Sequence, residues 1–561
     1  MRWRSTPPMP VRPAPAGRLH GGNIMKFWKP GLIAAALLAA APALAQDENV
    51  LTIGVRTEAA SMDPHWTQLS GDTQVQEHIF ERLVGLSSTS QPIPGLALSW
   101  EPIEEDKWEF KLREGVKWHD GEDFTADDVI FTYDRLRGGV SGAPASPAFQ
   151  LEKGGKMWEK IDDYTIHIST DGPYPTMAED LAMLPIVAEH AVRDAEPSVD
   201  FNTGQAAIGT GPYMFEEYSP GSRVTVKAFP DYWGGEPQWD RVVFQPVGQD
   251  SARLAALLNG DVDMIEYPPT IDLPQLVEDP NFVVSTIPAD RLIYIQPGFK
   301  HVEPFITDAN GEPIMPNPLR DWRVRKALSL AINREAIRDR IMGGASLPAK
   351  NIVPPGFFGY VEGLEADAYD PEQAQELLTA AGYPDGFNVV LHGPNDRYIN
   401  DARILEAVAQ MWSRVGVTTE VDAMPRNVFF SRLIRGDELS MPGHDVPEFS
   451  LAMTGWGTVA GEATYTVSGT LETYNAATGG GNGNFGRYSN SEIDARSVKA
   501  KRTIDNDERR AILEEAITIG MEDYAYIPIH FQVNQWAMKA GLEHDPRTNE
   551  RTRAMDVSRV D

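Results

Sequence analysis

Alternating hydrophobic positions predict strands in the first part of the chain. Three runs, at 51–55, 108–112 and 116–118, place apolar side chains at every second position, as a half-buried strand requires. Glu114-Gly115 separates the last two runs, so we expect a hairpin turn between them.

Polar caps predict where several helices begin. Thr125, with Asp128 three residues later, has the spacing of a capping box. Asp321 precedes a run with apolar residues at helical spacing, and Asp370-Pro371 supplies both an N-cap and a proline at the first helical position. Gly382 is the expected end of this last helix.

Strands and helices alternate in the second half of the chain. Residues 387–391 and 417–421 have the composition of buried strands. Between them, apolar residues from Ile404 to Trp412 share one face of a helix that ends near Gly416. Because strands joined by helices pair in parallel, we expect an α/β lobe with a mostly parallel sheet after about residue 320.

The composition restricts the class of function. The 561 residues are too many for a single core, so two or three lobes are expected. The chain has no cysteine, which excludes disulfides, thiolate metal sites and a cysteine nucleophile. Its formal net charge of −31 argues against a nucleic-acid partner or an anionic membrane surface.

The N-terminal segment has the features of a secretory signal peptide. From Met25 the chain reads MKFWKPGLIAAALLAAAPALAQ, with two lysines, a short apolar run and an Ala-x-Ala site. We expect cleavage after Ala45 and treat residues 1–45 as an N-terminal extension and signal peptide. They contain six basic and no acidic residues, so their removal lowers the formal net charge from −31 to −37. A soluble periplasmic protein is the simplest expectation.

Familiar catalytic motifs are absent or fail on context. Residues 481–486 match G-x-G-x-x-G, but no strand pattern precedes them and no helix pattern follows, so we expect a loop. His119-Asp120-Gly121 places a histidine beside carboxylates, although Asp-Gly is a turn signal. We therefore expect no enzyme, no cofactor and no metal site.

Several segments, in order along the chain, resemble the family 5 extracellular solute-binding proteins, the large peptide- and nickel-type binding components of bacterial ABC importers. They carry the resemblance across nearly all of the chain after residue 45: Ser99-Trp100-Glu101, residues 108–121, Phe124-Thr125-Ala126-Asp127-Asp128-Val129, Gly209-Thr210-Gly211-Pro212-Tyr213, residues 321–328, residues 331–337 and Phe485-Gly486-Arg487-Tyr488-Ser489-Asn490.

The resemblance implies an α/β fold of the two-lobed periplasmic-binding-protein type (type II), with an additional inserted subdomain in lobe I. By this analogy, lobe I takes residues 46–85, 208–290 and 525–561, and the inserted subdomain takes 86–207. Lobe II takes residues 291–524. The lobes would close like a hinge over a bound solute, and this closure requires no covalent step.

The resemblance also implies residues that face the ligand. The segment Thr57–Ser61, with Glu58 and Ala60, would run beside a peptide ligand, and Glu58 would hold an amine unless it is a solvated loop acid. Trp456 would stack on the ligand, or else pack in the core. Tyr294 is a further candidate.

A loop between a predicted strand and helix supplies three more candidates. Ligands of open α/β sheets bind at strand ends, where Arg397, Tyr398 and Asn400 are expected. Arg397 suits a carboxylate because a guanidinium donates two parallel hydrogen bonds, whereas Asn400 could instead cap the helix. Arg426 and Arg432 are weaker candidates.

The sequence departs from peptide-binding members at two positions. Many carry an Asp three residues after the pocket tryptophan, where this chain has Val459. Oligopeptide binders have an Arg three residues before it, where this chain has Met453. Glu462 could supply the missing acid, or it could be an ordinary loop charge.

We therefore expect a periplasmic solute-binding protein that captures a peptide or peptide-like solute and delivers it to the ABC permease in the inner membrane. We expect a monomer with no nucleic-acid partner. The same fold could bind glutathione, an opine, an oligosaccharide or a nickel chelate instead. A secreted hydrolase is the alternative from another class, and no motif supports it.

Overall fold

The computed structural model describes residues 48–143, 153–299, 305–438 and 449–560. The predicted signal peptide and its cleavage site lie outside these residues. No helix within the described ranges combines the length and hydropathy of a membrane-spanning helix.

Within the described residues, twelve strands form one mixed sheet, whose main path is β13-β15-β17-β12-β18-β11-β1-β10-β9-β8, with β14 beside β18 and β16 beside β15. Their bounds are β1 Val50–Val55, β8 Tyr213–Ser219, β9 Arg223–Ala228, β10 Arg241–Pro246, β11 Met264–Glu266, β12 Phe282–Pro297, β13 Ile306–Thr307, β14 Ser346–Pro348, β15 Phe387–Pro394, β16 Val417–Met424, β17 Leu451–Gly457 and β18 Ile527–Lys539.

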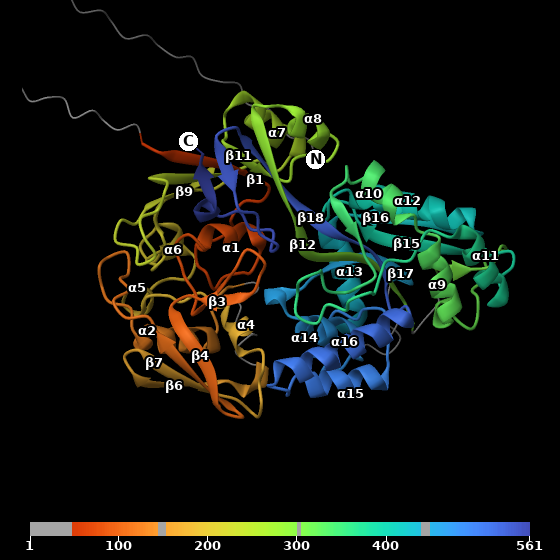
Figure 1. Ribbon diagram of the computed structural model, residues 1–561, viewed down its shortest axis with the longest axis horizontal. Helices are drawn as coiled ribbons and strands as arrows, with labels where there is room; N and C mark the ends of the chain where they lie inside the picture. Colours follow the sequence, from red (N-terminus) through yellow and green to blue (C-terminus); the bar gives the residue numbers. More distant parts are fainter. Residues whose placement is uncertain (1–47, 144–152, 300–304, 439–448, 561) are drawn as a thin grey trace, which may run out of the picture. The chain divides into compact units, whose positions relative to one another are not determined.

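The long strands β12 and β18 connect the two parts of this sheet. They run antiparallel and side by side, as Figure 1 shows. β12 continues to β17 on one side, whereas β18 continues to β11 on the other. Their register shifts between Pro288 and Leu292 and again between Ile293 and Tyr294, so the ladder between them is interrupted in the middle of β12.

Smaller sheets lie outside the main one. A four-stranded antiparallel sheet has the order β4-β5-β7-β6. The strands of the smaller sheets are β2 Val84–Leu86, β3 Pro92–Pro94, β4 Ala97–Glu104, β5 Lys107–Leu112, β6 Met157–Asp162, β7 Thr165–Ser169, β19 Leu542–His544 and β20 Val557–Arg559.

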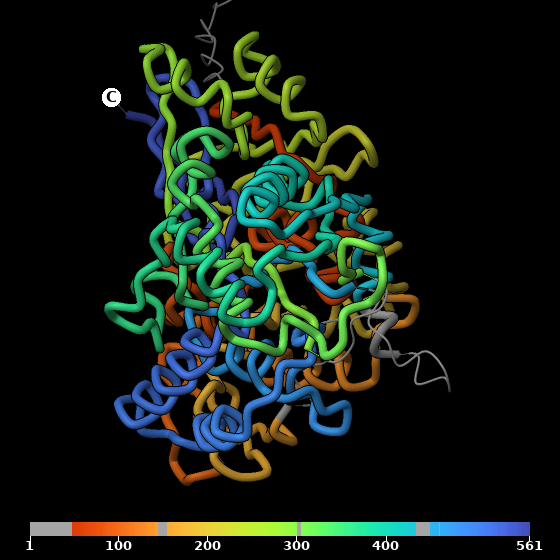
Figure 2. The backbone as a smooth tube through the Cα atoms, turned by 90° about the vertical axis from the view of Figure 1, so that its right-hand side faces the viewer, coloured from red at the N-terminus to blue at the C-terminus, as the bar shows by residue number. Residues whose placement is uncertain are grey.

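Helices connect and flank these strands. Their bounds are α1 Ser70–Gln76, α2 Ala126–Arg137, α4 Met177–Leu181, α5 Glu189–Val192, α6 Val199–Asn202, α7 Asp250–Asn259, α8 Leu273–Glu278, α9 Trp322–Leu330, α10 Arg334–Arg340, α11 Pro371–Ala380, α12 Asp401–Arg414, α13 Arg426–Glu438, α14 Ala463–Thr466, α15 Ser491–Ala500 and α16 Asn506–Glu522. The last two pack side by side, as the blue tubes of Figure 2 show.

The predicted caps of three helices are confirmed. Thr125 and Asp128 form a complete capping box at α2. Asp321 accepts a hydrogen bond from a backbone N–H in the first turn of α9, and Asp370 does so for α11. Gly382, with a φ of 98°, follows the end of α11, because only glycine adopts this left-handed backbone without strain.

Two predictions about pairing are wrong. The run 116–118 forms no hairpin with β5, which pairs with β4 and β7 instead, and only Lys117 makes an isolated bridge to Asp123. The sheet of the second half is mixed rather than mostly parallel. β15 is parallel to β16 and β17, but antiparallel strands, β13 and β12, flank this group.

Separate hydrophobic cores support the parts of the sheet. One core gathers side chains of β15, β17, α9 and α12 around the fully buried Trp412. A second surrounds β1 and β10 and includes Phe244 and Trp536. A third, with Trp118 and Phe110, fills the space between the four-stranded sheet and α2. Each core is large enough to hold its strand ends rigidly, and the candidate site lies at such strand ends.

Candidate ligand-binding site

A cavity of about 570 Å³ lies where segments far apart in the sequence meet. Seven stretches of the chain reach it: after β1, around the start of α1, at the end of β11, before α12, at the start of α13, on β18 and near the C-terminus. Its lining is polar and rich in charge: Arg56, Thr57, Glu58, Ala60, Leu69, Ser70, Gly71, Asp72, Gln74, Glu266, Tyr267, Asp396, Arg397, Ile399, Arg426, Asn427, Phe430, Gln532 and Glu550.

The first wall is the segment that leaves β1. The buried carboxylate of Asp72 accepts hydrogen bonds from the backbone N–H groups of Ala60 (2.6 Å) and Ser61 (2.9 Å). Position 71 beside this segment has room only for glycine, because a Cβ there would lie 2.8 Å from the carbonyl oxygen of Glu58. These contacts fix the backbone and leave the side chain of Glu58 exposed, where it accepts a hydrogen bond from the Gly221 N–H.

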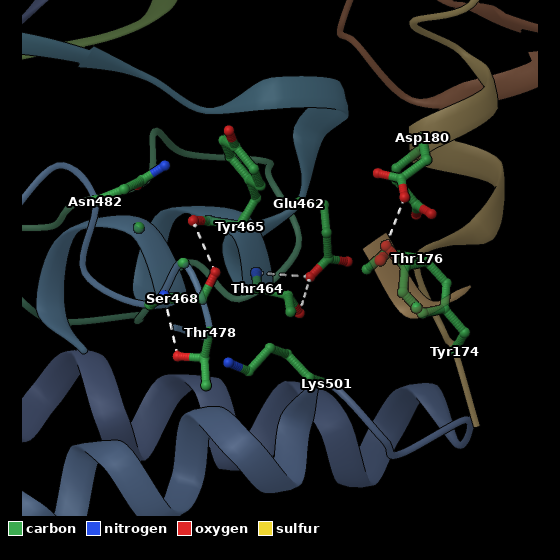
Figure 3. A pocket seen from close by; sticks show the side chains of 15 residues that line it. Tyr174, Thr176, Asp180, Glu462, Thr464, Tyr465, Ser468, Thr478, Asn482 and Lys501 are labelled. Carbon is green, nitrogen blue, oxygen red and sulfur yellow. Dashed lines mark hydrogen bonds between the residues drawn. The ribbon is translucent and has the colours of Figure 1, made fainter. Parts of the chain in front are cut away.

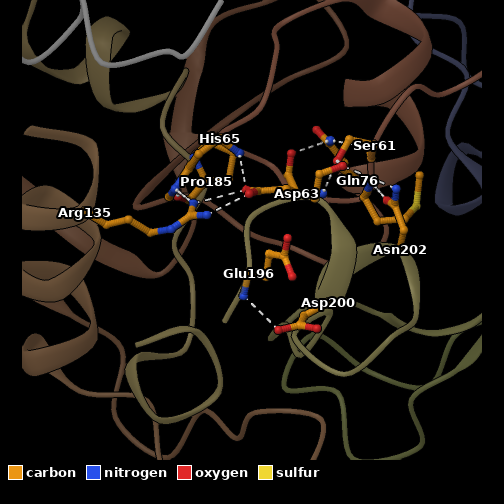
Figure 4. A network of polar contacts seen from close by, with 11 residues as sticks. Ser61, Asp63, His65, Gln76, Arg135, Pro185, Glu196, Asp200 and Asn202 are labelled. Atoms are coloured by element: carbon orange, nitrogen blue, oxygen red, sulfur yellow. Dashed lines mark hydrogen bonds and ion pairs between the residues drawn. The ribbon is translucent and has the colours of Figure 1, made fainter. Parts of the chain in front are cut away.

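A buried ion pair holds the continuation of the same segment, as Figure 4 shows. Arg135 donates to both carboxylate oxygens of Asp63, over 3.1 and 2.7 Å. His65 lies beside them, fully buried, and its Nε2 bonds the carbonyl oxygen of Pro185 (2.8 Å). Burial, and then the charge of Arg135, lower the pKa of His65 to about 4. The wall is thereby tied to α2.

A second wall is the loop between β15 and α12 together with the start of α13. The buried carboxylate of Asp401 accepts hydrogen bonds from the backbone N–H groups of Arg397 (2.9 Å) and Tyr398 (3.0 Å). Asp396 accepts another from the Arg426 N–H, over 2.6 Å. The loop is therefore held in a form that places Arg397 and Arg426 at the cavity.

The floor of the cavity is a group of buried and partly buried charges. Arg291, on β12, donates two hydrogen bonds to the carboxylate of Glu550, over 2.7 and 3.1 Å. Glu266 accepts hydrogen bonds from the backbone of Arg56 and from Thr552. Tyr267 beside it has a φ of 49°, which is costly for a bulky residue and is typical of functional sites.

The charges on the floor shift one another's pKa. Burial opposes the ionisation of Glu550, but the charges of Arg291, Arg397 and Arg56 outweigh it and hold the pKa of Glu550 below its ordinary value. Burial, and then the charge of Glu550, raise the pKa of Asp290 to about 8. The charge of Arg291, and then burial, lower the pKa of Arg397. The floor is therefore dominated by guanidinium groups.

Three of the eight predicted site residues line this cavity, namely Glu58, Ala60 and Arg397. Tyr398 is buried behind it, and its hydroxyl oxygen accepts a hydrogen bond from the Gly455 N–H over 2.8 Å. Asn400 occupies the N-cap position of α12 without capping it. Its amide donates instead to Thr270 Oγ1 (2.9 Å) and to a carbonyl oxygen at the end of α10.

Tyr294 and Trp456 line neither of the two cavities described here. Tyr294 is 2% exposed and contacts Tyr526, with 4.7 Å between ring centroids. Trp456 stacks on Tyr465 at 6.0 Å. Its indole Nε1 is buried and finds no hydrogen-bond partner within the part of the chain that the structure describes.

The last predicted residue, Glu462, lines a second cavity of about 260 Å³, shown in Figure 3. Its carboxylate accepts two hydrogen bonds from Thr464 and pairs with Arg509 (3.2 Å). Burial raises the pKa of Glu462 against the opposing charge of Arg509. Glu179 faces the same cavity, and burial followed by the charge of Glu462 raises its pKa to about 8.

Other residues that line the first cavity could not be predicted from a sequence motif. Arg56 directly precedes the predicted segment, but Glu266, Tyr267 and Glu550 belong to no motif. Among the described residues, no group of three or more His, Asp or Glu side chains could hold a metal ion. His119, the one histidine considered for a metal, bonds the backbone of Gly209 and Gly211 instead.

A cavity of this size at strand ends, assembled from distant segments and carrying charged groups, is typical of a protein that binds small solutes. A family model supports this class: the bacterial extracellular solute-binding proteins, family 5 (Middle), match residues 91–478. The chain belongs to this family.

Individual relatives agree with the family. The dipeptide-binding protein of Escherichia coli is 31% identical over 374 residues, which are 61% of this chain and 65% of that protein. The heme-binding protein A of Haemophilus influenzae is 29% identical over 488 residues, or 82% of each chain. The solved structure of HbpA2 from Haemophilus parasuis has the same fold, with a TM-score of 0.74 and 24% identity over 91% of this chain and all of that one.

Proposed function

We propose that this protein captures a peptide or peptide-like solute outside the cytoplasm and delivers it to the permease of an ABC importer. The observation that carries the proposal is the 570 Å³ cavity, whose volume is in the range of small-ligand sites. Glu58, Ala60 and Arg397, from segments far apart in the sequence, all line it. An extended peptide in this cavity would meet both the backbone of the segment after β1 and charged side chains.

Closure of two lobes would complete the site. We propose lobe I at residues 46–85, 208–290 and 525–561, the inserted subdomain at 86–207 and lobe II at 291–524. The interrupted pairing of β12 with β18 supports a hinge near residue 290. A ligand that contacts both lobes favours the closed state, and the permease would recognise that state. Export through a signal peptide cleaved after Ala45, and a monomeric state, belong to the same proposal.

A thermal-shift and calorimetry screen of the mature protein tests the function. The probes are dipeptides, tripeptides, glutathione, opines, oligosaccharides and nickel–histidine. A ligand at a hundred times its dissociation constant stabilises the folded protein by about 2.7 kcal/mol, which such a screen detects. Binding of peptides supports the proposal. Binding of another class alone would replace the ligand while keeping the transport role, and turnover of a probe would refute the binding role.

A further inference from the structure

A third cavity, of about 440 Å³, lies where the end of β12 meets the start of α9 and the chain before α15. Its volume is in the range of small-ligand sites, and it shares no residue with either cavity described above. Two segments that carry the family resemblance, 321–328 and 485–490, contribute to it, and neither reaches the 570 Å³ cavity. The proposed capture of a solute therefore gives this cavity no role.

Arginines supply most of the charge that lines this third cavity. Arg320, Arg325 and Arg487 line it, against a single lining carboxylate, that of Asp523. The carboxylate is already engaged, because Arg325 Nη2 donates to it over 2.8 Å. The other donors of Arg325 bond backbone carbonyl oxygens, so this pair belongs to the wall. On a chain with a formal net charge of −31, a lining of this sign favours an anionic ligand.

Arg320 is the lining guanidinium best suited to receive an anion. The side chain is exposed, and its Nε donates to the carbonyl oxygen of Phe299 over 2.8 Å, which anchors it at the cavity. Neither of its Nη groups bonds or pairs with another residue in the described part of the chain. Two parallel N–H donors of a guanidinium match the two oxygens of a carboxylate, so Arg320 can hold one bidentately.

Aromatic rings form the apolar part of the lining. Trp322 is 47% exposed, which leaves much of a large ring in contact with water. Phe299 is partly buried, and its ring meets that of Tyr488 edge to face, with 5.2 Å between centroids. The guanidinium of Arg325 lies 4.9 Å from the centroid of the Phe299 ring. A flat apolar group placed against Trp322 would remove its exposed surface from water, which is favourable.

The backbone at this cavity adopts the left-handed region twice. Arg487, which lines the cavity, has a φ of 62°, and Tyr524, which directly follows the lining residue Asp523, has a φ of 52°. This backbone is costly for bulky residues, and such residues cluster at binding sites. Tyr267 at the 570 Å³ cavity has the same feature. The third cavity therefore shares a property of the proposed solute site.

We propose that the third cavity binds a small aromatic carboxylate, whose carboxylate group pairs with Arg320 and whose ring lies against Trp322. Asp321, between these two residues, caps α9 through a backbone N–H and so fixes the segment that presents both side chains. The proposal does not depend on the proposed function, because the two sites share no lining residue.

Matched small molecules test the proposal by calorimetry on the mature protein. Benzoate is compared with benzamide, its neutral isostere, and with acetate, which has the charge but no ring. Benzoate should bind at least about tenfold more tightly than benzamide, the effect of a hydrogen bond between charged partners. It should bind about three- to tenfold more tightly than acetate, the effect of an aromatic contact. If benzoate binds no more tightly than either of the other two compounds, the proposal fails.

Four variants locate the binding. Arg320→Gln should remove the preference for benzoate over benzamide, and Trp322→Ala should remove the preference over acetate. Both side chains are exposed, so the variants should unfold at nearly the original temperature. Arg340→Gln, which removes an exposed arginine of α10 outside the cavity, is the matched control and should change neither preference. Benzoate binding that is lost in Arg426→Gln but kept in Arg320→Gln would place the ligand in the 570 Å³ cavity and overturn the proposal.

A crystal soaked in 4-bromobenzoate places the ligand directly, because bromine gives an anomalous signal. A bromine peak beside Trp322, with the carboxylate at Arg320, is the expected result. Bromine peaks confined to other parts of the molecule would refute the site.

Discussion

Replacing Glu462 by Gln separates a structural role from a ligand-binding role. Glu462 and Arg509 are each 4% exposed at their side chains, and Arg509 Nη2 lies 3.2 Å from Glu462 Oε2. Gln keeps an acceptor for Thr464 but removes the charge that compensates Arg509. Leaving one partner of a buried ion pair without the other costs about 3–5 kcal/mol, so we expect a loss of this size in the free energy of unfolding at pH 6.

Glu179 gives this loss a pH dependence. Its pKa of about 8 is raised by burial and by Glu462, and it is lowered by the charge of Arg509. In Glu462→Gln the repulsion is gone, so Glu179 ionises more readily and supplies the charge that Arg509 lacks. The loss of stability should therefore be smaller at pH 9 than at pH 6.

Urea unfolding at the two pH values, with peptide affinity measured in parallel, is the assay. Glu508→Gln is the control, because its pair with Lys499 is exposed and should contribute less than about 1 kcal/mol. A Glu462→Gln protein with unchanged stability but much weaker ligand binding would refute the reasoning. The carboxylate would then belong to the ligand site rather than to the fold.

Three further changes test other parts of the structure. Gly455→Ala places a Cβ about 2.8 Å from the Tyr398 ring, so it should cost about 1–3 kcal/mol in urea unfolding and weaken ligand binding by displacing the Arg397 loop. Asp72→Ala leaves two backbone N–H groups without their acceptor; we expect a loss of about 2–3 kcal/mol by calorimetry and faster hydrogen exchange at residues 60 and 61. His65, with a pKa of about 4 when folded against 6.5 ordinarily, contributes stability that is complete above pH 6.5 and is lost as the pH falls toward 4. His65→Gln should therefore flatten the acid limb of the stability–pH curve, and an unchanged slope would contradict this.

Local signals predicted the local structure well. A capping box at Thr125 and the caps at Asp321 and Asp370 depend on residues within one turn, so the sequence contains all of the information. The hairpin expected after β5 failed because strand pairing is decided by distant chain segments. β5 pairs with β4 on one side and, on the other, with β7, more than fifty residues later, so neither edge is left for the run 116–118.

The site was predicted only in part, for the same reason. Glu58 and Arg397 occupy loops that follow strands, where a sequence pattern indicates strand ends. Glu550 belongs to no pattern, and it reaches the floor because the segment after β18 folds back toward β12. Glu462 was the reverse case: the sequence offered it as a ligand-binding acid or an ordinary loop charge, but its partner Arg509 lies on α16 and only the fold reveals that pair.

The interrupted ladder of β12 gives Arg291 a particular position. Between Pro288 and Leu292, β12 has no paired partner on β18, and the backbone of Asp290 bonds Thr548 and Thr458 instead. Flexing of two long paired strands concentrates where cross-strand hydrogen bonds are missing. Arg291 lies at that point and holds Glu550, which lines the 570 Å³ cavity, so a bend there would move this part of the cavity lining. A change in the curvature of the sheet at this point would therefore change the position of Glu550 through its ion pair with Arg291.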